Sequence, residues 1–348
     1  DETGLRAVGL CRHFKRPLAA REISPCAGNS SSQVPFGHKF SLVTPLVHPV
    51  RVSGRRWERM HSTISVMNAK GGVGKSTLVL SLAETLSACH GKRVLVIDSD
   101  AHASINNMLM RSDWVQTFQG QSRSVVDYLI AAVLKNESVP WMSYLSTGVS
   151  DVDDARTVDL MPGGGHLTLF EREVSKAGLE SRLRLAVRTL LAETRSAYDF
   201  VLVDSAPGLS VLTEVWLREV DFYLSPTKPD YISTHGLQFL GQFSQRDSDM
   251  GFAECLGIII SMKDKSAFED AQYERWLRQN TKEPCFDQVI PRATSLQTAA
   301  HFCPRPRSYW AKYPGETGKA LRQLAAELLV RNSAAQTRKA YREGRAAE

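Results

Sequence analysis

The residues best suited to chemistry form one short stretch rich in glycine and lysine, Ala69-Lys70-Gly71-Gly72-Val73-Gly74-Lys75-Ser76-Thr77. Its glycines allow backbone N–H groups to turn inward around phosphate oxygens, because no Cβ atom stands in the way. A helix that begins at Lys75 would add the positive end of its dipole. The Lys75 ammonium could then reach the β- and γ-phosphates of a nucleotide, and the Ser76 hydroxyl could ligate Mg²⁺. The residues predicted to bind phosphate are Gly71, Gly72, Val73, Gly74, Lys75, Ser76 and Thr77.

Carboxylates follow two apolar runs elsewhere in the chain. Asp98 and Asp100 come at the end of the first run, and because they lie two residues apart they point the same way. Asp204 ends the second run, where such a carboxylate can hold Mg²⁺ through water. The alternative is structural: Asp98 and Asp100 would cap a helix that begins near Ser104, and the second run would be a buried strand that ends in a turn.

The elements that must position these residues alternate along the chain from residue 61. We expect strands at 63–68, 93–98, 200–204, 221–225 and 255–260, with further candidates at 158–161 and 286–290. Helical patterns cover 75–89, 124–134, 181–195, 209–219, 236–243, 267–278 and 317–330. The apolar runs are continuous rather than alternating, which is typical of strands buried on both faces. This predicts an α/β fold, with a doubly wound, mostly parallel sheet and helices on both faces.

The phosphate-binding stretch departs from the common G-x-x-x-x-G-K-[ST] pattern, because Ala69 replaces the first glycine and Lys70 is an additional lysine. In this it resembles the deviant Walker A loop of the ParA/MinD family of dimerising ATPases. The resemblance implies ATP and Mg²⁺ as cofactors and a homodimer that forms on ATP binding. It also implies that Lys75 acts within its own subunit, while Lys70 crosses to the nucleotide of the partner in the manner of an arginine finger.

The carboxylates extend the resemblance. Asp98 to His102 is similar to the family segment D-x-D-P-Q, with Ala101-His102 in place of Pro-Gln, and Ser205 to Leu209 is similar to the switch segment after the metal carboxylate. The family pattern implies that Asp100 positions the attacking water. The catalytic residues implied are Lys70, Lys75 and Asp100, and the metal-binding residues implied are Ser76, Asp98 and Asp204.

The likeness continues downstream and covers about residues 62–330. Ile290-Pro291-Arg292 resembles a loop that lines the base pocket in the family, which implies that Pro291 contacts the nucleotide. The strand at 255–260 resembles the one before the first base-binding loop, although Ser261-Met262-Lys263 stands where relatives often carry Asn.

Charge divides the 348 residues unevenly. Residues 1–60 hold ten Lys and Arg against four Asp and Glu, so they carry the whole net charge of +6. This segment also contains prolines and a serine run, which are typical of disorder. We therefore expect a basic extension at 1–60, an ATPase domain at 61–332 and a polar basic tail at 333–348. One hypothesis is that the working protein starts at Met60, and the rival hypothesis is a functional basic arm.

Composition and motifs argue against several functional classes. No apolar run approaches the roughly 18 residues of a membrane span, and residues 331–348 offer too little apolar surface for a membrane-anchoring helix. The six cysteines form no CxxC pair, and none follows Asp98 or Asp204 closely enough to hold an iron–sulfur cluster there. We expect unpaired thiols in a reducing cytoplasm. Tyr341 alone does not make the tyrosine cluster of a bacterial tyrosine kinase.

The ParA branch remains, and it implies a weak ATPase, stimulated by a ParB-like or adaptor protein, that binds DNA non-specifically as the ATP dimer. Such a protein would position a plasmid, a chromosome or a protein cargo and would associate with the nucleoid. Scattered cations could supply the phosphate contacts, although each cluster could equally be a solvated surface. The clusters are Arg331, Arg338, Lys339, Arg342 and Arg345; Arg305, Arg307 and Lys312; and Arg182, Arg184 and Arg188. The alternative is an ATPase of the same fold that regulates a partner protein without contacting DNA.

Overall fold

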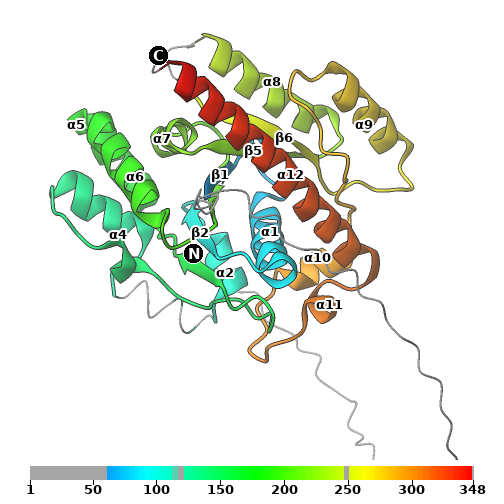
Figure 1. Ribbon diagram of the computed structural model, residues 1–348, viewed down its shortest axis with the longest axis horizontal. Coiled ribbons are helices and arrows are strands. Elements are labelled where there is room, and N and C mark those ends of the chain that lie inside the picture. The colour runs from blue at the N-terminus through cyan, green and yellow to red at the C-terminus, as the bar shows by residue number, and fades with distance from the viewer. Residues whose placement is uncertain (1–60, 112, 114, 116–120, 247–250, 347–348) are drawn as a thin grey trace, which may run out of the picture. The chain divides into compact units, whose positions relative to one another are not determined.

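The apolar runs form one six-stranded sheet in the computed structural model, which describes residues 61–111, 113, 115, 121–246 and 251–346 (Figure 1). The predicted extension at 1–60 lies outside the described residues. The strands are β1 (Ser62–Val66), β2 (Val94–Ser99), β3 (Val158–Met161), β4 (Phe200–Ser205), β5 (Phe222–Thr227) and β6 (Glu254–Ile260). Their order is β3-β2-β4-β1-β5-β6, and every neighbouring pair is parallel. The predicted α/β class and parallel sheet are confirmed.

Helices connect the strands and cover both faces of the sheet. They are α1 (Lys75–His90), α2 (Ser104–Leu109), α4 (Val125–Leu129), the π-helix η1 (Ile130–Leu134), the 3₁₀-helix η2 (Trp141–Tyr144), α5 (Leu167–Ala177), α6 (Glu180–Thr194), α7 (Val211–Glu219), α8 (Tyr231–Arg246), α9 (Phe268–Asn280), α10 (Thr294–Ala299), α11 (Tyr309–Lys312) and α12 (Gly315–Ala346). None of the helices in these described stretches is long and apolar enough to cross a membrane.

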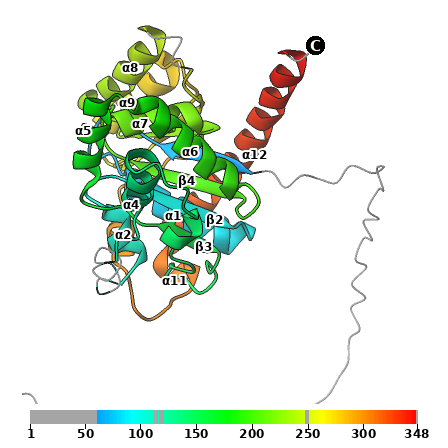
Figure 2. The same cartoon turned by 90° about the vertical axis from the view of Figure 1, so that its left-hand side faces the viewer.

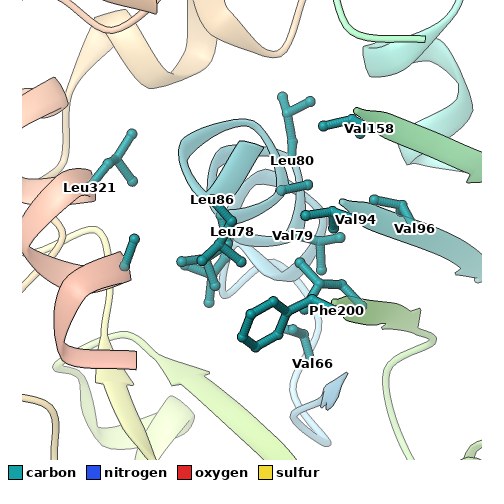
Figure 3. Close-up of a cluster of buried hydrophobic side chains, with 14 of the residues drawn as sticks. Val66, Leu78, Val79, Leu80, Leu86, Val94, Val96, Val158, Phe200 and Leu321 are labelled. Atoms are coloured by element: carbon teal, nitrogen blue, oxygen red, sulfur yellow. The ribbon is translucent and has the colours of Figure 1, made fainter. Parts of the chain in front are cut away.

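Two apolar cores sandwich the sheet, because successive side chains of each strand point to opposite faces. Val94 and Val96 join the core beneath α1 and α12, whereas Leu95 and Ile97 join the core beneath α4 to α7. Figure 3 shows the first core, where side chains of α1 lie between the strands and Leu321 of α12. Helices α5, α6 and α7 gather together over the second core (Figure 2).

Three expectations change in the structure. The predicted strand at 286–290 is wrong: this segment makes only isolated backbone bonds to β6, such as Phe286 N–H to the Ile258 carbonyl at 2.8 Å. The predicted helix at 124–134 changes from α to π geometry at Ile130. The terminal helix is longer than its apolar stripe, since α12 continues without a break through the expected boundary between residues 332 and 333.

Candidate active site

The predicted phosphate-binding and metal-binding residues lie at the carboxyl ends of three adjacent strands. Strand β4 runs between β1 and β2, so that Asp204 is in register with Val66 on one side and with Asp98 on the other. The phosphate-binding loop leaves β1 at this same edge and opens α1. The topology therefore brings Asp98, Asp204 and the loop together, in the crevice where open α/β sheets bind their ligands.

Asn68, a residue that no sequence motif singles out, fixes the start of the loop. Its side-chain oxygen accepts a hydrogen bond from the Lys70 N–H at 2.8 Å, and its amide nitrogen donates to the Pro226 carbonyl at 2.9 Å. Gly236 of α8 approaches so closely that a Cβ there would lie 2.6 Å from the Asn68 oxygen. The end of β5 and α8 thus support the loop from one side.

The loop itself uses glycine where its backbone demands it. Gly72 and Gly74 have φ angles of +72° and +90°, in the left-handed region that residues with a Cβ rarely adopt. Gly74 lies directly before α1, so the loop delivers its N–H groups to the start of that helix. The Ser261 hydroxyl donates to the Val73 carbonyl at 2.8 Å and ties the loop to the end of β6.

The two loop lysines have different environments. Lys75 is buried, and its ammonium donates to the Lys70 carbonyl at 3.4 Å. Burial lowers the pKa of Lys75, while the nearby carboxylates of Asp204 and Asp100 oppose that shift. The Lys70 side chain is exposed to solvent. The two loop lysines therefore differ in burial: Lys75 lies inside the site and Lys70 is open to solvent.

Asp98 and Asp204 are fully buried carboxylates with unused acceptor oxygens. Within the described residues, the two side-chain oxygens of Asp204 have no hydrogen-bond partner, and the Oδ2 atom of Asp98 has none either. Burial raises the pKa of Asp204 to about 7, and the charge of Asp100 adds to this rise. The Ser76 hydroxyl and the Lys75 ammonium act to lower the pKa, although neither group forms a hydrogen bond with Asp204. Burial and the Asp204 charge raise the pKa of Asp98 as well. Buried, unpaired acidic groups are costly unless a cation completes them.

Asp100 lies beyond the strand in a turn closed by the Ala103 N–H on the Asp100 carbonyl at 2.9 Å. Its Oδ1 accepts a hydrogen bond from the His102 N–H at 3.0 Å and lies 2.9 Å from the His102 Nδ1. His102, which replaces the family's Gln, therefore holds the carboxylate predicted to position water. On the opposite face of β2, the Trp216 indole donates to the Ser99 hydroxyl at 2.7 Å and anchors the strand end.

A cavity of about 560 Å³ adjoins the loop and contains several predicted residues. Gly74 and Thr77 line it from the loop, Met262 from the end of β6, and Pro291 and Arg292 from the segment beside β6. Pro291, which the sequence resemblance implies contacts the nucleotide, thus lines the same cavity as the phosphate-binding loop. Met262 has a φ of +55° and its methyl group packs 3.1 Å from the place where a Cβ of Gly74 would be.

The residues at the sheet edge fit a magnesium ion held with nucleotide phosphates. No group of three or more His, Cys, Asp or Glu side chains that could hold a metal alone forms in the described part of the chain. Mg²⁺ is usually bound by one or two carboxylates together with substrate phosphates. The unpartnered oxygens of Asp204 and Asp98, with the Ser76 hydroxyl nearby, supply that donor set.

Comparisons with known proteins agree with this geometry. A family model described as an AAA domain matches residues 61–249. The chromosome partitioning protein ParA of Caulobacter vibrioides is 27% identical over 271 residues, which cover 77% of this chain and 94% of that protein. The chromosome-partitioning ATPase Soj of Thermus thermophilus is 28% identical over 270 residues, covering 77% of this chain and 95% of that protein.

Solved structures share the fold. Cobyrinic acid a,c-diamide synthase from Mycobacterium smegmatis, crystallised with an ATP analogue and magnesium, superimposes with a TM-score of 0.59 at 21% identity. The match covers 77% of this chain and 94% of that protein. The family match spans more than half of the chain and includes the phosphate-binding loop, both strand-end aspartates and the switch segment. The chain therefore belongs to this AAA domain family, within the ParA/MinD group of P-loop ATPases.

Proposed function

We propose that the protein binds ATP with Mg²⁺ and hydrolyses it to ADP and phosphate, as a dimerisation switch of the ParA type. The observation that carries this proposal is the position of Asp204, a buried carboxylate with two unpartnered oxygens between Asp98 and the phosphate-binding loop. A purely structural aspartate at such a place would be expected to have donors around it. The partitioning relatives and the structure solved with an ATP analogue and magnesium support the same ligand.

Each residue has a role that its environment allows. The loop N–H groups and Lys75 bind the phosphates, and the low exposure of Lys75 strengthens that attraction. Asp98, Asp204 and Ser76 hold Mg²⁺, which when bound neutralises charge on the β- and γ-phosphates. Asp100, oriented by His102, accepts a hydrogen bond from the water that attacks the γ-phosphate. Pro291 contacts the base in the adjoining cavity.

Lys70 supplies the link to dimerisation. Its side chain is exposed whereas that of Lys75 is buried, so a second copy of the chain would bring Lys70 to the partner's nucleotide. Hydrolysis would then require two subunits, as in enzymes that receive a cationic finger in trans. Lys70→Ala is expected to bind ATP normally but to hydrolyse it slowly at every protein concentration.

The cellular role follows the partitioning relatives. We propose that the ATP dimer binds DNA non-specifically and positions a plasmid, a chromosome or a protein cargo, with a ParB-like or adaptor protein that stimulates hydrolysis. Binding to the nucleoid would follow from this. The test is retention of the full chain on non-specific DNA with ATP, ADP or no nucleotide over a salt series. Retention should require ATP and fall steeply with salt, and the DNA role is lost if ATP produces no salt-sensitive binding.

A second function is favoured by one observation, which is that most cations in the predicted DNA-binding clusters already have partners. Arg338 and Arg342 pair with Glu254, Lys339 with Asp221, and Arg331 with Glu327. Arg184 and Arg188 pair with Glu219, and Lys312 is buried against Glu84 and Asp151. An ATPase that regulates a protein partner without contacting DNA would have no need for free cations there. The same DNA-retention series separates the two roles, because ATP-dependent dimerisation without DNA retention would support this second function.

A further inference from the structure

A glycine that follows β3 lies directly against the Asp98 carboxylate. A Cβ on Gly163 would lie 2.8 Å from the Asp98 Cγ, 3.0 Å from its Oδ2 and 3.1 Å from its backbone carbonyl oxygen. Real Cβ atoms essentially never come within 3.0 Å of another heavy atom, and part of this contact is rigid backbone. Any side chain at position 163 would therefore displace the carboxylate or the strand that carries it.

The position of Gly163 is itself fixed by Asn106 in the first turn of α2. The Asn106 amide nitrogen donates to the Gly163 carbonyl at 3.0 Å, and its side-chain oxygen accepts from the Gly163 N–H at 3.0 Å. Asn106 is 1% exposed, so this pair of bonds has no competition from water. The two bonds join the end of β3 to the helix that follows the Asp100 turn.

We propose that Gly163, held by Asn106, is a positioning residue that fixes the orientation of the Asp98 carboxylate for the magnesium site. The inference rests on the proposed function, because it assumes that Asp98 serves Mg²⁺. Its physical basis is independent of that function, since the closeness of Gly163 to Asp98 and the two Asn106 bonds are properties of the folded chain. Residues that orient a metal ligand typically change metal affinity by about 10- to 100-fold when they are altered.

The chain provides a matched set of variants in Gly163-Gly164-Gly165. A Cβ on Gly164 would meet not Asp98 but the Ser124 hydroxyl, at 2.9 Å. Ser124 is the N-cap of α4, so a change there acts on the end of a helix. A Cβ on Gly165 would have nothing within 4 Å. The same substitution, glycine to alanine, thus tests two different contacts within one loop and provides a third position without a contact as the control.

The experiment titrates Mg²⁺ against binding of a fluorescent, non-hydrolysable ATP analogue to the full chain. In Gly163→Ala the Mg²⁺ concentration for half-maximal binding should rise roughly tenfold to a hundredfold, while binding in the absence of Mg²⁺ stays at the wild-type level. Gly164→Ala should lower the melting temperature and leave the Mg²⁺ titration unchanged. Gly165→Ala should change neither.

The outcomes separate the inference from the function beneath it. If the wild-type chain shows no Mg²⁺-dependent binding of the analogue, the proposed function fails. If the wild type binds but Gly163→Ala titrates like Gly165→Ala, the positioning role is wrong. Should Gly163→Ala fail to fold, Asn106→Ala provides the test, because it leaves the glycine in place and removes both bonds. A severalfold rise in the Mg²⁺ requirement of Asn106→Ala supports the role, and an unchanged titration contradicts it.

Discussion

Two buried aspartates at opposite edges of the same sheet have opposite surroundings. Asp221, at the amino end of β5, accepts hydrogen bonds from the Thr63 N–H at 3.0 Å and the Thr63 hydroxyl at 2.9 Å, and pairs with Lys339 at 2.7 Å. Asp204, at the carboxyl end of β4, has no hydrogen-bond partner among the described residues. Both side chains are almost wholly buried, so burial alone does not distinguish the two carboxylates.

Their acidities differ in direction. Burial acts to raise the pKa of both carboxyls, but at Asp221 the bonds to Lys339 and Thr63 outweigh it, and the pKa falls below its usual range. At Asp204 the Ser76 hydroxyl and Lys75 act to lower the pKa, but burial outweighs them and the pKa rises to about 7. The Asp221 carboxylate at the amino edge is completed by groups of the protein itself, whereas the Asp204 carboxylate at the carboxyl edge is completed only by a ligand. Perturbed, unpaired groups of this kind are typical of functional sites.

The largest test of this comparison replaces one lysine at each edge. Lys75→Ala removes the buried cation near Asp204, and we expect nucleotide affinity to fall by about a thousandfold. Lys339→Ala removes the cation that pairs with Asp221. It should leave nucleotide affinity unchanged and lower the free energy of unfolding by about 1 kcal/mol. Fluorescent-nucleotide titrations and urea melts measure both effects. Wild-type affinity in Lys75→Ala would refute the assignment of the phosphate site.

A second test separates binding from hydrolysis. Asp100→Ala should bind ATP as the wild type does, since the loop and Lys75 remain, but hydrolysis should slow by about a hundredfold because no carboxylate positions the water. The ATP-bound dimer should then accumulate in size-exclusion chromatography. His102→Ala is the matched control, and its hydrolysis rate should fall less because it only orients Asp100. A normal rate in Asp100→Ala would show that another group positions the water.

A third test uses pH and works in opposite directions at the two edges. The raised pKa of Asp204 means that its carboxyl ionises less readily in the folded state than in the unfolded state. Below pH ~4 the carboxyl is protonated in both states, so it does not lower the free energy of unfolding. As the pH rises from ~4 to ~7 it lowers the free energy of unfolding progressively, and the full loss is present above pH ~7. Because each pKa unit corresponds to about 1.4 kcal/mol, Asp204→Asn should raise the free energy of unfolding of the nucleotide-free protein by about 4 kcal/mol at pH 8 and hardly change it near pH 4.

The Asp221 arm of this test has the other sign. Its lowered pKa means that its contribution to stability is present above pH ~4 and is lost as the pH falls through the folded-state value. Asp221→Asn should destabilise the protein at neutral pH, and its difference from wild type should shrink in acid. Urea melts from pH 3 to 8 give both curves, and curves of the same sign would remove the contrast between the edges.

Much of the site can be predicted from the sequence because its signals are local. The order of residues from Ala69 to Thr77 fixes the loop, and aspartates that end apolar runs fall at the carboxyl edge of a parallel sheet whichever strands become neighbours. The same local signals predict strands β1 to β6 within a few residues. The prediction of a strand at 286–290 failed because this segment has the apolar composition of a strand but makes only isolated backbone hydrogen bonds to its neighbour.

The remaining features depend on contacts between distant parts of the chain. Nothing local to Asn106 or Gly163 shows that they hold Asp98, since the two residues are 57 positions apart, and the contact that anchors Asn68 to the end of β5 is 158 residues away. The ion pairs of α12 are hidden for the same reason: Arg338 and Lys339 form a free basic cluster in the sequence, and only the fold brings Glu254 and Asp221 beside them. A sequence therefore shows how many cations a segment has, but not which of them are already paired.

The smallest expected effect concerns those paired cations. Arg338 and Arg342 both pair with Glu254, but their side chains are 52% and 72% exposed, so each pair is worth about 0–1 kcal/mol. Arg338→Ala with Arg342→Ala should barely change the urea midpoint, nucleotide affinity or retention on DNA, because the carboxylate already occupies these cations. Arg305→Ala, at an exposed position of another cluster, is the matched control. A steep loss of ATP-dependent DNA retention in the double variant, with stability intact, would mean that the pairs with Glu254 open for phosphate. The amino edge of the sheet would then be functional as well. Ion pairs in the nucleotide-free chain would no longer show that the residues forming them have a purely structural role.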